Sequence, residues 1–322
     1  MKKALVLINK ISDNPSADEL DVLVQAEAVE KALDELGYDH QREFFDLDLK
    51  NITSVLSQNP PDLVFNLVET VAGKGELIHL PPSLLESFNV PFTGSGSLSL
   101  LLTTNKLRTK KILKANGVPT PEWFVQNDTE KHDKRKKYIL KPAWEDGSAG
   151  ITDDSIITGD QVNLQELSRT MKLKNIFIEE YIHGREFNLS ILAGKNGPEV
   201  MPVAEMQYLD FPADKPRILN YASKWEADSF EYSHTIRTFE IPESDRDLSS
   251  ALTNISKRCW ELFELKGYAR VDFRADENNR PYVLEINTNP CLSPDSGFPA
   301  ACAKAGLIYT EMINRIIQDA RI

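Results

Sequence analysis

The sequence is poor in three features that each mark a whole class of protein: cysteine, long apolar runs and positive charge. Its 322 residues include 3 cysteines, and no two of them form a Cys-x-x-Cys pair. This excludes a disulfide-stapled secreted scaffold and a zinc ribbon. No apolar run approaches the ~18 residues of a membrane span, and the run at residues 4–8 is too short for a secretory signal. We therefore expect a cytoplasmic protein with reduced thiols and no membrane partner.

The shortage of positive charge excludes a second class. Lysine and arginine number 37 against 49 aspartates and glutamates, which gives a net charge of −12. A general nucleic-acid binder needs a Lys/Arg excess to neutralise phosphates, so we expect no nucleic-acid partner. A local basic pocket for a small phosphate ligand remains compatible with this charge. The length and the 41% apolar content are those of a soluble protein with two or three domains.

The first hundred residues show a βαβ rhythm. Apolar runs predict strands at residues 4–8, 62–67 and 89–94, and apolar periodicity predicts helices at 19–36 and 77–88. This alternation indicates an α/β fold with a parallel sheet flanked by helices. We expect this N-terminal domain to cover residues 1–100.

The rest of the chain divides into two further blocks. The first, residues 101–185, has the pattern of a small α+β domain. Its predicted helices lie at 103–117 and 161–170, and its predicted strands at 123–125, 138–140, 155–158 and 175–178. The second block, residues 186–322, is rich in strands, with a long polar loop over 208–234 followed by a helix, a hairpin and a final helix.

The hairpin, GYARVDFRADENNRPYVLEIN, carries polar residues along one face. Period-2 alternation assigns one face to Ala269, Val271, Phe273 and Ala275, and the other to Tyr268, Arg270, Asp272 and Arg274. In the second strand the pattern assigns Leu284 and Ile286 to the core and Val283, Glu285 and Asn287 to the other face. A two-residue turn at 278–279 would pair Asp272 with Glu285 and Arg270 with Asn287.

Two facing carboxylates repel each other unless they are protonated, paired or bound to a metal ion. Carboxylate and amide oxygens suit Mg²⁺, which commonly bridges protein carboxylates and substrate phosphates. A solvated sheet face with an arginine–acid network is the alternative. The hairpin alone leaves both interpretations open.

Three upstream stretches have the chemistry to bind a nucleotide, although each is weak evidence alone. Lys106 opens a basic helix, and Lys141 ends a strand that runs into a Gly/Ser loop at 146–150. Small residues let backbone N–H groups approach phosphate oxygens, while a lysine supplies a point charge. The third stretch, IFIEEYIHGRE, is a strand that ends in acids and a glycine turn.

Taken in order, Lys106, Lys141, the Gly/Ser loop, IEEYIHGRE, ARVDF and LEINTNP make the chain resemble the ATP-grasp superfamily. Within it, the chain is most similar to the D-alanine–D-alanine ligases and their relatives. The similarity covers nearly the whole chain, including VPFTGSG and GLIYTEMINRII. It implies three domains, 1–100, 101–185 and 186–322, with ATP between the sheets of the second and third. A homodimer is also compatible, since the family is commonly dimeric.

The resemblance implies a role for each of these polar residues. ATP would be bound by Lys106, Lys141, Ser148, Glu179, Glu180, Ile182 and Glu186. Two Mg²⁺ ions, with Mn²⁺ as an alternative, would be bound by Asp272, Glu285 and Asn287. Catalytic roles would fall to Arg270, Lys224 and Ser148.

The implied reaction joins a small-molecule carboxylate to an amine. ATP phosphorylates the carboxylate, and the amine attacks the acyl phosphate to form an amide. Phosphoryl transfer of this kind needs positioning and charge neutralisation, which lysines, an arginine and metals provide. The second step needs donors aimed at the oxyanion, and Arg270 and a backbone N–H near Cys291 are candidates. No nucleophilic thiol is required, so we interpret Cys291 as non-nucleophilic and Cys259 and Cys302 as small semi-buried residues.

The positions that face the amino-acid substrates depart from the family. The nearest acids to the family's ammonium-binding acid are Asp18 and Glu19, although Glu19 is equally explained by the helix dipole. Glu69 stands in FNLVETVAGKGE, where the family has a His-Gly-x-Gly-Gly-Glu stretch. Trp225 follows Lys224 in place of a tyrosine, and indole accepts no hydrogen bond.

The loop after LEINTNP both departs from the family and matches it. Cys291 replaces a glycine, whereas Ser296 matches the serine that receives the carboxylate of the amine substrate. We therefore expect an ATP-dependent carboxylate–amine ligase for amino acids or small peptides, with a pocket altered from that for two D-alanines. A D-alanine–D-alanine ligase proper and a non-catalytic ATP-binding protein are the alternatives.

Overall fold

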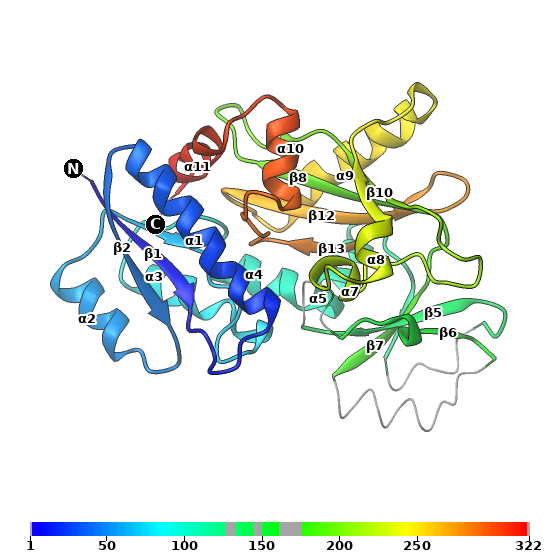
Figure 1. Ribbon diagram of the computed structural model, residues 1–322, viewed down its shortest axis with the longest axis horizontal. Coiled ribbons are helices and arrows are strands. Elements are labelled where there is room, and N and C mark those ends of the chain that lie inside the picture. Colours follow the sequence, from blue (N-terminus) through cyan, green and yellow to red (C-terminus); the bar gives the residue numbers. More distant parts are fainter. Residues whose placement is uncertain (1, 126–132, 145–147, 149, 161–174, 321–322) are drawn as a thin grey trace.

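The computed structural model describes residues 2–125, 133–144, 148, 150–160 and 175–320. The predicted helix at 161–170 and residues 146, 147 and 149 of the Gly/Ser loop lie outside this range. Figure 1 shows the N-terminal strands and α1 on the left, the C-terminal sheet at the upper right and the sheet of β5, β6 and β7 below it. The fold is a mixed α/β ATP-grasp architecture, as the resemblance implied.

The N-terminal sheet is parallel, as predicted, with strand order β2–β1–β3. Its elements are β1 (Lys2–Asn9), α1 (Ala17–Glu35), β2 (Tyr38–Phe45), α2 (Lys50–Gln58), β3 (Leu63–Asn66) and α3 (Leu80–Ser87). The pattern missed β2 and α2, because β2 is an edge strand whose residues are mostly exposed or half-buried. The predicted strand at 89–94 is wrong: Asn89 and Gly94 have positive φ, and Phe92 alone forms a bridge, to Val64.

Two helices follow this sheet, α4 (Ser97–Thr104) and α5 (Lys106–Ala115). The prediction of one helix over 103–117 is therefore wrong at its start, because α4 ends at Thr104 and a new helix begins at Lys106. Asn105 separates the two helices, and its side-chain oxygen accepts the backbone N–H of Arg108 at 2.9 Å. This cap makes Lys106 the first residue of α5. The backbone N–H of Lys106 in turn donates to the carbonyl of Ala143 at 2.9 Å, beside the Gly/Ser loop.

The central sheet is antiparallel, with strand order β4–β7–β5–β6. Its strands are β4 (Trp123–Phe124), β5 (Lys137–Pro142), β6 (Ile156–Thr158) and β7 (Ile176–Glu180). One hydrophobic cluster of this sheet is built on Tyr138 and Ile178, with three half-buried neighbours among the described residues. Lys141 and Glu179 lie on β5 and β7, the two inner strands of this sheet.

The C-terminal sheet has the order β11–β10–β8–β12–β13, with β9 pairing on β8. Its strands are β8 (Arg185–Leu192), β9 (Glu199–Val200), β10 (Ala204–Tyr208), β11 (Thr235–Thr238), β12 (Tyr268–Ala275) and β13 (Pro281–Asn287). The apolar stretch EVMPVAEM, residues 199–206, indicates one strand in the sequence, but two strands occur there, β9 and β10. The predicted loop over 208–234 contains two short helices, α7 (Ala222–Trp225) and α8 (Phe230–His234).

The hairpin pairs Asp272 with Glu285 and Arg270 with Asn287, as predicted, but its turn and its register differ from the prediction. Its connection spans residues 276–280, not a two-residue turn, and a β-bulge between Asp272 and Phe273 shifts the register by one. The bulge reverses the side-chain parity of β13. Val283 therefore joins the core, whereas Leu284, predicted to be buried, lines the pocket described below.

Helices cover both faces of the C-terminal sheet. The helix α9 (Arg246–Leu262) packs with the alternate residues of β12 and with Leu113 of α5 in one core. On the other face, α10 (Gly297–Lys304) and α11 (Tyr309–Gln318) share a core with β1 and α1. Cys259 and Cys302 are fully buried in these cores, and burial raises the pKa of each thiol to about 12. No helix in the described ranges is long and apolar enough to cross a membrane.

Candidate functional site

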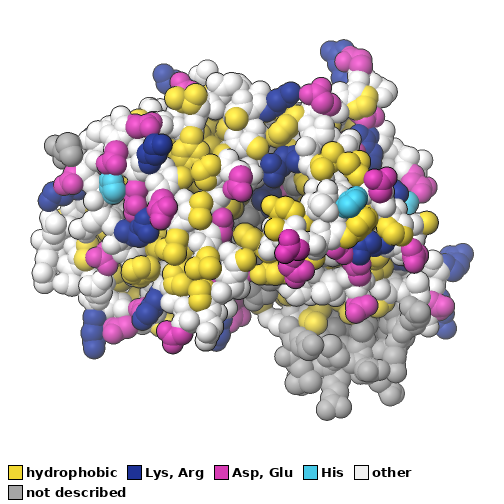
Figure 2. Space-filling model, viewed as in Figure 1, with side chains coloured by type: hydrophobic (Ala, Val, Ile, Leu, Met, Phe, Trp, Pro, Cys, Tyr) yellow, Lys and Arg dark blue, Asp and Glu magenta, His cyan; other side chains and the backbone are white. Residues whose placement is uncertain are grey.

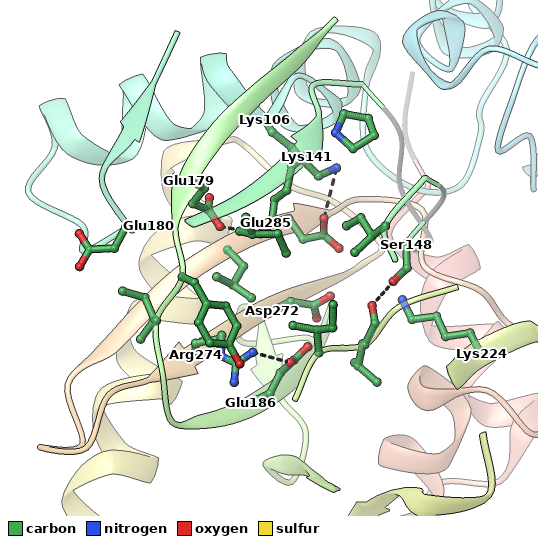
Figure 3. A pocket seen from close by; sticks show the side chains of 18 residues that line it. Lys106, Lys141, Ser148, Glu179, Glu180, Glu186, Lys224, Asp272, Arg274 and Glu285 are labelled. Carbon is green, nitrogen blue, oxygen red and sulfur yellow. Dashed lines mark hydrogen bonds and ion pairs between the residues drawn. The ribbon is translucent and has the colours of Figure 1, made fainter. Parts of the chain in front are cut away.

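The pocket between the central and C-terminal sheets gathers most of the residues that the resemblance implied (Figure 3). Residues of α5, β5, β7, β8, α7, β12 and β13 line it. The predicted members among them are Lys106, Lys141, Ser148, Glu179, Glu180, Ile182, Glu186, Lys224, Asp272 and Glu285. Arg270, Asn287 and the five residues predicted to bind the substrates do not line this pocket.

At one end of the pocket, the buried carboxylate of Glu179 lies between two lysines. Lys141 donates to it at 2.5 Å, and the ammonium of Lys110 lies 2.5 Å from its other oxygen. Burial opposes ionisation of Glu179, but the two lysines outweigh it and lower the pKa of Glu179. Burial lowers the pKa of Lys110 to about 8, against the attraction of Glu179. Glu179, one of the residues expected to bind ATP, lines the pocket and holds Lys141 in place.

A second buried ion pair lies between α5 and β13. The ammonium of Lys106 is 3.2 Å from a carboxylate oxygen of Glu285. Burial alone would raise the pKa of Glu285, but Lys106 and Lys224 lower it to about 2. Glu285 is therefore a carboxylate across the whole physiological pH range, surrounded by positive charge.

Asp272 faces Glu285 across the hairpin and is buried. Both its oxygens accept from Arg270, whose Nε and Nη2 lie 2.7 Å and 2.8 Å away. Burial opposes ionisation of Arg270, but Asp272 outweighs it and raises the pKa of Arg270. The hairpin therefore does carry an arginine–acid pair, but the pair is largely buried, whereas the alternative interpretation placed it on a solvated face.

The donor set nevertheless fits a divalent cation. The carboxylates of Asp272 and Glu285 both face the pocket, and hard oxygens on two carboxylates, completed by phosphate and water, are the usual Mg²⁺ environment. Among the described residues no three acidic, histidine or cysteine side chains cluster as a metal cage. Asn287 does not reach the pocket, and its amide oxygen accepts the backbone N–H of Asn289 at 3.0 Å.

Lys224 and Ser148 lie at the open side of the pocket (Figure 3). Ser148 has φ 66°, and its hydroxyl donates to the carbonyl of Leu219 at 2.6 Å, which ties the Gly/Ser loop to the segment before α7. Burial and the neighbouring Arg270 lower the pKa of Lys224. The carboxylates of Glu285 and Asp272 act in the opposite direction on the pKa of Lys224, so its ammonium interacts electrostatically with both residues implied to bind metal.

Glu186 lies at the base of the pocket and is fixed by two partners. Tyr208 donates to it at 2.7 Å, and Nη1 of Arg274 lies 3.4 Å from the same oxygen. Glu180 instead points away from the other labelled residues and is bound by Lys136 at 2.7 Å. Ile182 contributes a buried apolar side chain to the pocket wall.

Two residues predicted to bind substrate, Glu69 and Cys291, meet in a network outside this pocket. Gln25 of α1 donates to Glu69 at 2.8 Å and to Asp21 at 3.1 Å. The thiol of Cys291 lies 2.9 Å from Asp21, and Ser293 donates to the other oxygen of Asp21 at 2.7 Å. Burial raises the pKa of Cys291, and the nearby carboxylates add to this effect. A thiol held protonated is a poor nucleophile, in line with our interpretation.

The other three predicted substrate residues occupy separate places. Glu19 accepts from the backbone and the hydroxyl of Ser12, so it fixes the loop before α1. Trp225 is half-buried, with its ring 6.5 Å from that of Tyr221. Ser296 precedes α10, and its hydroxyl donates to the carbonyl of Cys291 at 2.8 Å.

Sequence reasoning missed several residues of the site. Lys110 lies one helical turn after Lys106, a spacing that could have indicated a second lysine on the same helix face. Arg274 shares the polar face of β12 with Asp272 and was not assigned a role. Asp18 accepts from the hydroxyl of Tyr221 at 3.0 Å, and no signal in the sequence linked these two distant residues.

Comparisons with known proteins agree with this geometry. A family model described as D-ala D-ala ligase C-terminus matches residues 112–318. An uncharacterized protein of Sinorhizobium fredii is 32% identical over 92% of this chain and 87% of its own length. The D-alanine–D-alanine ligase of Rickettsia massiliae shows the same identity and coverage, and that of Aquifex aeolicus is 29% identical over 92% of this chain and 94% of its own length.

Solved structures of low sequence identity show the same fold. The D-alanine–D-alanine ligase of Bacillus anthracis, in complex with ATP, matches with a TM-score of 0.72 at 21% identity, covering 99% of this chain and 97% of that one. D-alanyl-alanine synthetase A of Vibrio cholerae matches with a TM-score of 0.76 at 18% identity, covering 98% of each chain. The family uses ATP and divalent metal ions. This chain belongs to the D-Ala–D-Ala ligase family, and it is an ADP-forming ligase with the ATP-grasp fold.

Proposed function

We propose that this ligase joins an amino acid or small peptide, through its carboxylate, to the amine of a second amino acid or peptide, and that its substrate pocket differs from that for two D-alanines. The observation that carries the proposal is a contrast between two regions. The polar residues expected for ATP and metal, all except Asn287, line one pocket. On the substrate side, Cys291 replaces a glycine and is tied to Asp21, and Glu69 is tied to Gln25.

The phosphate end of ATP fits the lysine-rich part of the pocket. Lys106 and Lys141 are buried beside Glu285 and Glu179, so their ammonium groups are fixed before any phosphate arrives. Fixed cations stabilise a transferring phosphoryl group without reorganising as charge develops. Ser148 and the Gly/Ser loop would close over the phosphates, and Glu186 would accept from the ribose hydroxyls.

We propose that Asp272 and Glu285, with Asn287 in an outer position, hold two Mg²⁺ ions. Bound there, the metal ions would neutralise phosphate charge and polarise the transferred group. The protein's own part is to keep Glu285 ionised, and the lysines around it do so by lowering its pKa to about 2. Mn²⁺ would fit the same oxygen ligands.

In the second step the amine attacks the acyl phosphate, and a tetrahedral oxyanion develops. Arg270 is held by Asp272 in a bidentate geometry, so its orientation is fixed before the reaction. We propose that Arg270 and Lys224 stabilise this charge, and that Ser296 receives the carboxylate of the amine substrate. Glu19, Glu69, Trp225 and Cys291 would border the two substrates.

Three further features belong to this proposal. The domain division is 1–100, 101–185 and 186–322, although residue 100 lies within α4 (Ser97–Thr104). The protein would act in the cytoplasm, since its family joins small molecules with ATP. A homodimer is the assembly that the family would suggest.

A screen of ADP release tests the function. The protein is incubated with ATP and Mg²⁺ over a panel of D- and L-amino acids and dipeptides, alone and in pairs, and products are identified by mass spectrometry. We expect release with at least one pair other than two D-alanines. No release with any pair, together with no ATP-dependent rise in melting temperature, would contradict the proposal.

One observation favours a second candidate, a D-alanine–D-alanine ligase proper. Ser296 matches the family serine, and the relatives with established names at 29–32% identity are D-alanine–D-alanine ligases. In the same screen this candidate predicts the D-alanine dipeptide as the best product. A non-catalytic ATP-binding protein would release no ADP with any amine. In such a protein, Asp272→Asn would change the result of no turnover assay.

A further inference from the structure

Arg237 is a guanidinium at the edge of the C-terminal sheet that no part of the proposed reaction uses. It lies on the edge strand β11, opposite Met206 of β10. Its side chain packs against Gly297, the first residue of α10: a Cβ placed on Gly297 would lie 3.5 Å from Nη2 and 3.6 Å from Nε. The guanidinium therefore rests against the backbone directly after Ser296, where we have placed the carboxylate of the amine substrate.

No acid in the described part of the chain forms an ion pair or a hydrogen bond with Arg237. Burial lowers the pKa of Arg237, and the positive charge of Arg270 lowers it further. Asp295 opposes this from a distance but lies outside ion-pair range. The Arg237 side chain is exposed on this edge strand and interacts electrostatically with a second guanidinium, that of Arg270, so two positive charges favour an anion that binds beside it.

The anion that would bind Arg237 is not part of the nucleotide. Arg237 does not line the pocket between the two sheets, where Lys106 and Lys141 face the proposed phosphate site. Arg270 is paired with Asp272, whereas Arg237 has no ion-pair partner among the described residues. Figure 2 shows side chains of both charges, Lys/Arg and Asp/Glu, beside the hollow near the middle of the molecule.

We propose that the amine substrate is a dicarboxylic amino acid, and that Arg237 binds its second carboxylate. This rests on the proposed function, which assigns the first carboxylate to Ser296. A planar guanidinium fixed against a glycine presents a fork of N–H donors that matches a carboxylate bidentately. An acidic side chain one or two methylenes long would carry its carboxylate past Ser296 toward Arg237, while its amine stays at the acyl phosphate.

The test compares each acidic amine with its neutral isostere: aspartate with asparagine and glutamate with glutamine, as both enantiomers, using the best carboxylate donor from the ADP-release screen. We expect wild-type protein to prefer the acidic amine. Arg237→Gln should raise KM for the acidic amine about 10- to 100-fold, as expected for a lost charge-assisted pair, and leave KM for the isostere unchanged. Arg237→Lys should retain part of the preference, because it keeps the charge and loses the fork.

Arg246→Gln is the matched control, since Arg246 is an exposed arginine whose ion pair with Glu243 lies on the surface. It should leave the acidic-to-neutral ratio unchanged, and melting temperatures establish that all variants are folded. Two results would overturn the inference while leaving the ligase assignment intact: a wild-type protein with no preference for dicarboxylic amines, or an Arg237→Gln effect that is equal for both isosteres. Absence of ADP release with every pair would instead remove the proposed function itself.

Discussion

At the scale of single residues, the site is organised by lysine–carboxylate pairs that are buried before any ligand binds. Glu285 shows the consequence most clearly, because its pKa of about 2 reflects lysines that outweigh its burial. Removing the carboxylate of Glu285 leaves Lys106 without its buried partner and removes a proposed metal ligand. A buried charge without its partner is costly, so the effect should be large.

Glu285→Gln should therefore reduce ATP-dependent ADP release by about 100-fold or more, since one change removes both a proposed metal ligand and the partner of Lys106. Glu277→Gln, in the connection of the same hairpin, changes an exposed acid and serves as the control. Circular dichroism and a melting curve show whether each variant is folded. Full activity in a folded Glu285→Gln protein would contradict the metal assignment.

Lys110 makes a pH-dependent prediction. Below its pKa of about 8 it is charged and shares Glu179 with Lys141. Above that pH it becomes neutral, Glu179 attracts Lys141 alone, and less positive charge remains for phosphate. The dissociation constant for ATP, measured by calorimetry from pH 6.5 to 9.5, should therefore rise above pH 8 in wild-type protein. In Lys110→Gln this step should be absent; a step of the same size would show that another group titrates.

At the scale of elements, the turn between β7 and β8 fixes the relation of the two sheets that enclose the pocket. Gly184 has φ +144°, and a Cβ there would lie 2.0 Å from the carbonyl oxygen of Ala275. Nη2 of Arg274 also donates to the carbonyl of Gly184 at 3.0 Å. The turn therefore depends on glycine for both its conformation and its contact with β12.

Gly184→Ala should lower the free energy of unfolding by about 3–5 kcal/mol, since backbone must move to admit the methyl group. Gly197→Ala is the control: it has a positive φ of +112° but nothing within 4 Å of the added carbon. It should cost about 1–2 kcal/mol, from backbone strain alone. Urea denaturation measures both. Equal losses would show that the contact with Ala275 contributes nothing.

The hairpin of β12 and β13 and the edge strand β2 show which features of the fold could be predicted from the sequence. The pairing of Asp272 with Glu285 follows from alternation, and it is correct although the predicted turn is wrong, because a five-residue connection and a one-residue bulge compensate. The same bulge turns Leu284 from the core to the pocket, and alternation carries no signal for it. The missed strand β2 has the mixed exposure of a sheet edge, where apolar periodicity is weak.

Contacts between distant segments were the least predictable part of the site. The tyrosine expected after Lys224 is Trp225, yet Tyr221, directly before the same short helix, donates to Asp18 of α1. Glu69 and Cys291 were expected near a substrate, and both join the network around Gln25 and Asp21. These contacts depend on how α1 packs on the C-terminal loop, which no local pattern specifies.

At the scale of the whole molecule, the three sheets differ in what holds them together. One core unites β1 and α1 with α10 and α11, so the two ends of the chain stabilise each other. The C-terminal sheet has a second large core with α9 and α5. The strands of the central sheet are short, with 2 residues in β4, 6 in β5, 3 in β6 and 5 in β7, against 8 in β1 and β12. Regions held by few ladder hydrogen bonds open with lower free energies than the rest of a fold.

Hydrogen exchange should therefore show β5–β7 amides exchanging through local opening, while β1 and β12 amides exchange through global unfolding. In the proposed complex, ATP with Mg²⁺ would contact the pocket that both sheets line, so it should slow exchange in β5 and β7 selectively. At a ligand concentration of about 100 Kd, binding stabilises the closed form by about 2.7 kcal/mol, or about 100-fold in exchange rate. ADP with Mg²⁺ is the comparison, because it lacks the γ-phosphate. If ATP slowed exchange equally in all three sheets, the central sheet would be part of one cooperative unit and its short strands would not govern its opening.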